Sequence, residues 1–99
     1  MEKRKTIIIN DFQLYILLNE EEKKGFRILQ NNCFCTTCKE ERHLTSIQSI
    51  FLNDLNDILI DGTCPFCGGK MARYMKFGED QTFSKRADLF RKSIDPELL

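Results

Sequence analysis

Two Cys-x2-Cys pairs constrain the fold of this chain more than any other feature of its sequence. The first pair is Cys35 and Cys38, and the second is Cys64 and Cys67, which a glycine follows directly. A spacer of two residues lets both sulfurs of a pair converge from one tight turn. Four thiolates are the ligand set that tetrahedral Zn²⁺ takes in a closed structural site. We therefore predict one Zn²⁺ per chain, held by these four cysteines.

A fifth thiol, Cys33, and the single histidine, His43, are alternative ligands. Cys33 could replace Cys35 through a wider spacing to Cys38, and His43 could replace one thiolate. We expect neither replacement, because the pair with the two-residue spacer matches its counterpart and four thiolates already complete the shell. Cys33 is then a small strand residue near the site, and His43 is a surface imidazole.

The charge of the chain is balanced overall and uneven along its length. Its 15 basic and 15 acidic residues cancel, which excludes a global field that would attract DNA or a membrane surface. Most charged residues between positions 39 and 69 are acidic, whereas most of those between 70 and 92 are basic. This asymmetry indicates either a binding face or the pairing of charges within the molecule.

No segment of the sequence has the length and apolar character of a membrane span. The most apolar run, residues 12–18, is far too short to cross a bilayer. Asn10 and Asp11 interrupt the apolar start of the chain before a secretory core could form. We expect a cytoplasmic protein without a membrane partner, and in that compartment five cysteines favour metal ligation over disulfides.

The N-terminal part predicts a short strand followed by a helix. Residues 6–9 are all β-branched, which is typical of a strand. Asp11 is a candidate N-cap for a helix over 11–24, and Gly25 follows where that helix would end. A strand over 12–18 is an alternative, because the apolar residues there are too crowded to form a clean helical stripe.

Residues 44–63 are compatible with either a helix or a hairpin. Apolar residues recur there at a helical period, but two Asn-Asp pairs of turn type interrupt the pattern. We favour a hairpin with strands over 47–52 and 58–63, because it returns Cys64 to the side of Cys38. Four ligands on one metal ion require that return.

Three further elements complete the expected fold. Residues 26–29 predict a strand that leads into the first cysteine pair. Over 70–77, residues that would alternate between the two faces of a strand predict another strand. Apolar residues at helical spacing predict a helix over 82–94. Asp95-Pro96 would end that helix, because the residue before a proline is pushed out of the helical region.

Residues 33–77 resemble the zinc-ribbon and rubredoxin-like family through the motifs Cys-Thr-Thr-Cys at 35–38 and Cys-Pro-Phe-Cys-Gly at 64–68. The resemblance implies a small α+β fold in which two knuckles sit on a three-stranded antiparallel sheet. Here an N-terminal and a C-terminal helix would flank this ribbon within one domain over 1–99. Rubredoxins bind iron at two such knuckles, each followed by glycine, and transfer electrons. Lys39 stands where they have the first glycine, so we prefer zinc and keep an iron electron carrier as an alternative.

We expect a binding module rather than an enzyme. Four thiolates leave zinc no open position, and with one histidine the common general base is nearly absent. The predicted C-terminal helix carries an apolar stripe: Phe83, Ala87, Phe90 and Ile94. Through Phe83 and Phe90 this helix would dock on a protein partner or on a second copy, as an adapter or regulatory module does. The alternative is that the stripe packs on the chain's own sheet.

Nucleic-acid binding is the alternative function. Lys70, Tyr74 and Lys76 share one face of the predicted strand, and a ring among cations suits stacking on a base together with phosphate contacts. Arg86 on the C-terminal helix extends this face, and so do Lys85, Arg91 and Lys92. Lysines that protect an edge strand would produce the same pattern. We prefer the adapter role, because a neutral net charge argues against tight nonspecific binding to nucleic acid.

Overall fold

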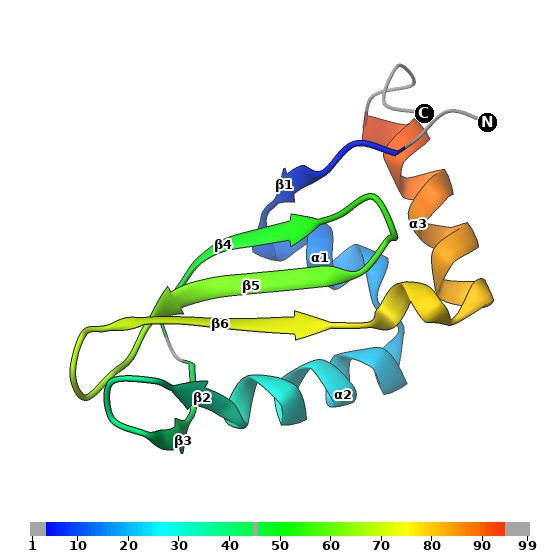
Figure 1. Cartoon of the computed structure of the whole chain (residues 1–99). Helices are drawn as coiled ribbons and strands as arrows, with labels where there is room; N and C mark the ends of the chain where they lie inside the picture. Colours follow the sequence, from blue (N-terminus) through cyan, green and yellow to red (C-terminus); the bar gives the residue numbers. More distant parts are fainter. Residues whose placement is uncertain (1–3, 45, 95–99) are drawn as a thin grey trace.

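The computed structural model describes residues 4–44 and 46–94, which form two antiparallel sheets and three α-helices (Figure 1). In chain order the elements are β1 (Ile7–Ile9), α1 (Asp11–Leu17), α2 (Glu20–Asn31), β2 (Cys33–Cys35), β3 (Glu40–Arg42), β4 (Ser46–Leu52), β5 (Ile58–Thr63), β6 (Lys70–Met75), the 3-10 turn η1 (Phe77–Glu79) and α3 (Gln81–Ile94). One sheet has four strands in the order β1-β4-β5-β6, and β2 pairs with β3 in a second sheet. The predicted α+β class is confirmed. The predicted three-stranded sheet is wrong in detail, because β1 adds a fourth strand and the first cysteine pair lies on a separate hairpin.

The structure has two helices, α1 and α2, where one N-terminal helix was predicted, and an asparagine caps the start of each. Asn10 Oδ1 accepts the N–H of Gln13 at 2.7 Å, and Gln13 Oε1 accepts the N–H of Asn10 at 2.9 Å. Asn19 and Glu22 form the same reciprocal pair at 2.8 Å. Such capping boxes begin a helix at the residue after the cap. The prediction of one continuous helix over 11–24 is therefore wrong, and its cap is Asn10 rather than the aspartate that follows.

Gly25 lies inside α2 rather than at its end. The helix continues through residues 26–29, where we expected a strand, and Phe26 faces the core with 7% of its surface exposed. Burial of an apolar face provides most of the stability of a helix in a protein. It offsets the cost of an interior glycine, which is about 1 kcal/mol relative to alanine.

The hairpin predicted within residues 44–63 is confirmed. Ile50 of β4 pairs with Ile60 of β5, and Leu52 pairs with Ile58. All four side chains are almost fully buried, whereas alternate residues such as Leu59 lie on the opposite, partly exposed face of the sheet. In the view of Figure 1, α1 passes behind this sheet. The core therefore lies on one face of the sheet, and the other face is more open.

Helix α3 confirms the helix predicted over 82–94, but its apolar stripe faces inward. Phe83, Ala87 and Phe90 are at most 9% exposed, within the core of this chain, and Ile94 is 41% exposed. The structure shows that the stripe packs on the chain's own sheet and helices, which was the alternative interpretation. Phe83 and Phe90 are therefore not the exposed docking surface that we predicted. The existence of a partner stays a prediction.

Arg91 ties α3 to two other parts of the chain and is itself fully buried. Its Nε donates to Asn56 Oδ1 at 2.9 Å, and its two Nη groups donate to the carbonyl oxygens of Lys5, Leu52 and Asn53. These acceptors belong to the end of β4, to the β4–β5 turn and to the segment before β1. The prediction that Arg91 extends a nucleic-acid face is wrong, because solvent does not reach its guanidinium.

Candidate metal centre

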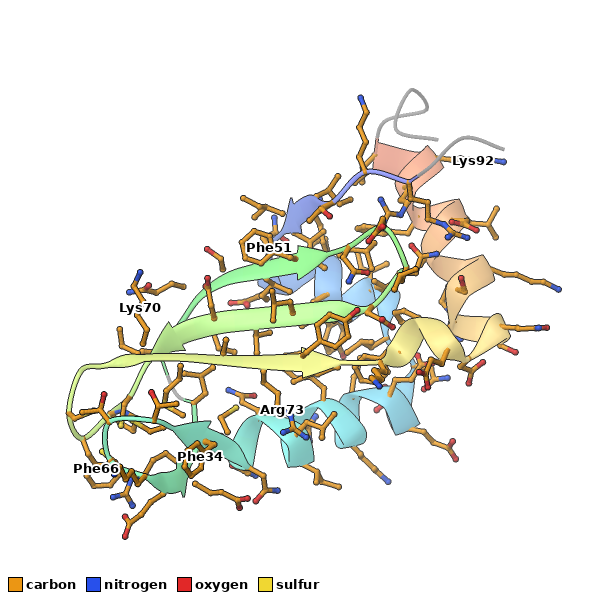
Figure 2. All side chains as sticks on the ribbon, in the orientation of Figure 1. Phe34, Phe51, Phe66, Lys70, Arg73 and Lys92 are labelled. Carbon is orange, nitrogen blue, oxygen red and sulfur yellow. The ribbon has the colours of Figure 1, made fainter. Side chains whose placement is uncertain are left out.

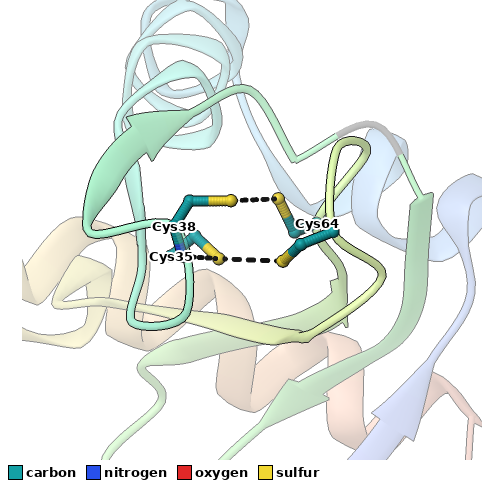
Figure 3. A group of neighbouring side chains, drawn as sticks. Cys35, Cys38 and Cys64 are labelled. Atoms are coloured by element: carbon teal, nitrogen blue, oxygen red, sulfur yellow. Dashed lines mark hydrogen bonds between the residues drawn. The ribbon is translucent and has the colours of Figure 1, made fainter.

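Four cysteine sulfurs meet at one end of the molecule (Figure 3). The Sγ atom of Cys35 lies 3.5 Å from that of Cys67, and the Sγ atom of Cys38 lies 3.7 Å from that of Cys64. All four sulfurs lie within 4.8 Å of one another. The return of Cys64 to the side of Cys38, which favoured the hairpin, is confirmed.

The spacing of these sulfurs fits a tetrahedral metal ion. Zn–S bonds of about 2.3 Å place any two sulfurs of a tetrahedron about 3.8 Å apart. A disulfide would need about 2.05 Å between its sulfurs, and all five cysteines are free. The group is therefore able to hold one metal ion. A shell of four sulfurs suits zinc and iron alike.

The turn between β2 and β3 presents the first cysteine pair. Cys35 ends β2, and the N–H of Lys39 donates to its carbonyl oxygen at 2.7 Å, which closes the turn. The N–H of Cys38 donates to the Sγ atom of Cys35 at 3.4 Å. Lys39 has a φ of 60°, in the left-handed region. This lysine therefore takes the backbone conformation that favours glycine.

The second cysteine pair follows β5 and is built in the same way. The N–H of Gly68 donates to the carbonyl oxygen of Cys64 at 3.0 Å, and Gly68 has a φ of 73°. The N–H of Gly69 donates to the Sγ atom of Cys67 at 3.3 Å. A Cβ on Gly69 would lie 3.0 Å from Thr37 Oγ1 of the first turn. The two turns thus meet closely, with backbone donors directed at sulfur.

Hydrogen bonds make the thiols of the group unequal. The backbone N–H of Cys67 lowers the pKa of Cys64 to about 6. A side-chain hydrogen bond with Cys67 raises the pKa of Cys38 to about 12. The hydrogen bonds within the group therefore favour the thiolate form of Cys64 over that of Cys38. A divalent cation between the sulfurs would favour the thiolate form of all four.

The alternative ligands Cys33 and His43 lie outside this group of four. Cys33 is fully buried in β2, and its thiol donates to the carbonyl oxygen of Leu29 at 3.5 Å. Burial raises the pKa of the Cys33 thiol, and the charge of Arg73 opposes this effect. His43 is exposed, and within the described residues neither side chain belongs to a cluster of metal-type ligands. Cys33 is thus a buried strand residue, as predicted.

The residues predicted to bind nucleic acid fall on two separate parts of the structure. Lys70 and Tyr74 lie on the exposed face of β6, and Lys76, directly after the strand, is exposed as well. The Tyr74 hydroxyl donates to Asp57 Oδ2 at 2.6 Å, and this hydrogen bond raises the pKa of Tyr74. Arg86 lies on α3 and donates to a carboxylate of α2 at 2.6 Å. It therefore braces two helices and does not continue the β6 face.

Two exposed phenylalanines beside the candidate metal centre were not predicted from the sequence. Phe34 is 53% exposed and Phe66 is 72% exposed. Figure 2 shows both at the end of the molecule that carries β2 and β3. The guanidinium of Arg42 lies over the Phe66 ring, 4.2 Å from its centroid. The exposure of Phe34 could have been predicted from the alternation of side chains along a strand. Cys33 and Cys35 are buried, so Phe34 between them lies on the opposite, exposed face.

Comparisons with known proteins assign no family to this chain. No protein-family model matches the sequence, and neither a curated protein nor a solved structure matches it. In the part of the chain that the structure describes, none of the helices combines the length and the apolar character needed to span a membrane. The cysteine group and the exposed side chains are therefore the features that bear on the function of this chain.

Proposed function

We propose that the chain is a zinc-binding module of zinc-ribbon type, in which Cys35, Cys38, Cys64 and Cys67 hold one Zn²⁺. The observation that carries this proposal is the set of four sulfurs within 4.8 Å of one another. The role of the ion is structural, because four thiolates leave it no open position for a substrate. Bound there, it would join the β2–β3 hairpin to the loop between β5 and β6.

An iron centre of the rubredoxin kind is the alternative for the same four ligands. The lysine after the first cysteine pair favoured zinc in the sequence analysis. However, Lys39 takes the left-handed backbone conformation of a glycine, with a φ of 60°. This departure from the rubredoxin pattern therefore does not separate the two metals, and metal analysis has to do so.

Elemental analysis of protein from cells supplied with both metals tests the assignment. We expect one zinc per chain and a colourless protein, whereas a red protein with one iron would replace the proposal by an electron carrier. Cys67→Ala should lose the metal, and because Cys67 is exposed this variant leaves the core intact. Cys33→Ala is the matched control and should keep its full metal content. Equal metal content in Cys67→Ala and the unmodified chain would contradict the assignment.

For the action of this module we propose an adapter or regulatory role in the cytoplasm, through protein–protein contacts. Its support is the pair of exposed aromatic rings, Phe34 in β2 and Phe66 in the turn of the second cysteine pair. Exposed aromatic residues rimmed by polar groups are typical of interaction sites. This surface takes the place of the buried Phe83 and Phe90.

Affinity capture from source-cell lysate tests the adapter role. The unmodified chain should recover a partner that the double variant Phe34→Ser and Phe66→Ser does not recover. Leu89→Ser is the control, because Leu89 is 66% exposed on α3, away from the metal centre. Recovery of the same proteins by all three chains would count against this surface.

A second candidate function is single-strand nucleic-acid binding by β6. The observation that favours it is Tyr74, 42% exposed between Lys70 and Lys76 on the open face of the sheet. Such a ring can stack on a base while the lysines contact phosphates. Mobility shifts with DNA and RNA at two salt concentrations, with Tyr74→Ala as the comparison, test it. No shift at low salt, where phosphate contacts are strongest, would exclude this function.

A further inference from the structure

Strand β1 is an open edge of the four-stranded sheet. The strand order places β4 on its inner side, and no described strand pairs with its outer side. At the opposite edge, β6 packs against β2. β1 consists of three isoleucines without a charge or a proline, and its central residue Ile8 is 69% exposed. An edge of this composition lacks the charged or proline residues that usually prevent strands from pairing.

We propose that β1 pairs antiparallel with β1 of a second copy of this chain, so that two four-stranded sheets join into one. An antiparallel pair of identical strands is self-complementary, and it therefore gives a closed two-fold dimer. This interaction depends neither on the metal nor on the proposed function.

The register of the pair follows from the face that each side chain takes. Ile8 lies on the open face of the sheet, while Ile7 and Ile9 lie on the core face. Residues that lie opposite each other in antiparallel strands point to the same face of the sheet. The two-fold axis must therefore pass through a residue, because an axis between two residues would set side chains of opposite faces against each other. An axis at Ile8 sets every isoleucine opposite an isoleucine. An axis at Ile7 or Ile9 would set Lys5 or Asp11 opposite an isoleucine instead.

The same register brings opposite charges together. Counted along the chain with the axis at Ile8, Lys5 of each copy falls opposite Asp11, the first residue of α1, in the other copy. Both side chains are exposed, and neither forms an ion pair within the described residues. Asn10 keeps the chain extended up to Asp11, with φ −97° and ψ 176°. Arg91 holds the carbonyl oxygen of Lys5, which fixes the segment before the strand.

The dimer would also cover the exposed end of an apolar row. Ile8 pairs with Phe51, Phe51 with Leu59, and Leu59 with Tyr74, so these side chains cross the open face of the sheet. Pairing at Ile8 continues this row into the second copy. Because only three residues per chain pair, we expect a weak dimer whose population depends on protein concentration.

Sedimentation equilibrium over a hundredfold range of protein concentration tests the dimer. The unmodified chain should shift from monomer to dimer, and Ile8→Lys should remain monomeric because an edge lysine blocks strand pairing. Ile28→Lys is the matched control, since Ile28 is 61% exposed on α2, and it should dimerise normally. Circular dichroism and metal content of the same samples show that the variants are folded and loaded. Strictly monomeric unmodified protein would overturn the proposal and leave the edge to an extended segment of a different protein.

Charge exchange tests the register. Lys5→Glu and Asp11→Lys should each weaken the dimer by about tenfold, because each creates two like-charge pairs across the axis. An equimolar mixture of the two single variants should recover dimerisation, since all its charge pairs are then opposite. The double variant should recover it on its own. If both single variants weaken the dimer and neither the mixture nor the double variant recovers it, this register is overturned.

Discussion

At the scale of single residues, the position after each cysteine pair decides how the metal-site turn closes. Lys39 and Gly68 both have left-handed backbone conformations, with φ of 60° and 73°. Each donates its N–H to the carbonyl oxygen of the first cysteine of its pair. A Cβ makes this conformation costly by roughly 1–2 kcal/mol, and glycine avoids that cost. The first turn is therefore strained at Lys39, whereas the second turn is not strained at Gly68.

Lys39→Gly should relieve this strain and stabilise the metal-loaded protein by up to about 1 kcal/mol. Gly68→Ala should destabilise it by about the same amount, because it introduces the strain into the second turn. Thermal unfolding in excess zinc measures both changes. Gly25→Ala is the control, because Gly25 lies in a helix with free space around it and alanine should stabilise it there. A lower unfolding midpoint for Lys39→Gly would show that its left-handed turn carries no strain.

At the scale of elements, a buried arginine fixes α3 in addition to its apolar stripe. Burial lowers the pKa of Arg91, but a guanidinium remains charged in proteins. Its cost of desolvation is offset by the acceptors that surround it: Asn56 Oδ1 and the carbonyl oxygens of Lys5, Leu52 and Asn53. The helix, the β4–β5 turn and the N-terminal segment are thus joined at one point.

Arg91→Met should lower the free energy of unfolding by about 3–5 kcal/mol, because it leaves buried carbonyl oxygens without donors. Lys92 is the next residue of α3 and is exposed to solvent, so Lys92→Met should change the free energy of unfolding by less than about 0.5 kcal/mol. Urea unfolding monitored by circular dichroism measures both. Equal midpoints for the two variants would mean that the arginine network contributes nothing to stability.

At the scale of the whole molecule, the two ends are held together by different forces. The sheet, α1 and α3 share a core of apolar side chains. At the other end, residues 36–37 and 65–68 are exposed, and Cys35 and Cys64 are the residues of the two cysteine turns that belong to this core. A structural zinc in small peptides contributes roughly 10–16 kcal/mol of apparent binding free energy. We therefore expect folding of this end to depend on the metal, while the apolar core keeps the rest of the molecule folded.

Removal of the metal by a chelator should expose β2, β3 and residues 64–69 to solvent while β4, β5 and α3 stay folded. Hydrogen exchange followed by mass spectrometry would show fast exchange only at the metal end. Return of zinc should restore protection there. Loss of protection throughout the chain would mean that the apolar core cannot fold without the metal.

Much of the candidate site was predictable from the sequence because its signals are local. The spacing within each cysteine pair sets which sulfurs converge, and the requirement that four ligands meet selected the hairpin over a helix for residues 44–63. The helix over 82–94 was likewise readable from its apolar period. Asn19 and Glu22 carried a capping signature that would have divided the first helix correctly. That signal was present in the sequence and was overlooked.

The sequence by itself therefore determined the group of four cysteines, the hairpin that assembles it and the C-terminal helix. The spacing within each cysteine pair and the helical period are local patterns, and the hairpin followed from the requirement that two pairs far apart in the chain meet. Only the tertiary structure decided that Gly25 lies within a helix, that Phe83 and Arg91 are buried, and that β1 stands at an edge of the four-stranded sheet. These outcomes depend on which distant segments cover a side chain or pair with a strand. Burial and strand pairing are properties of the packed molecule, and a local pattern does not contain them.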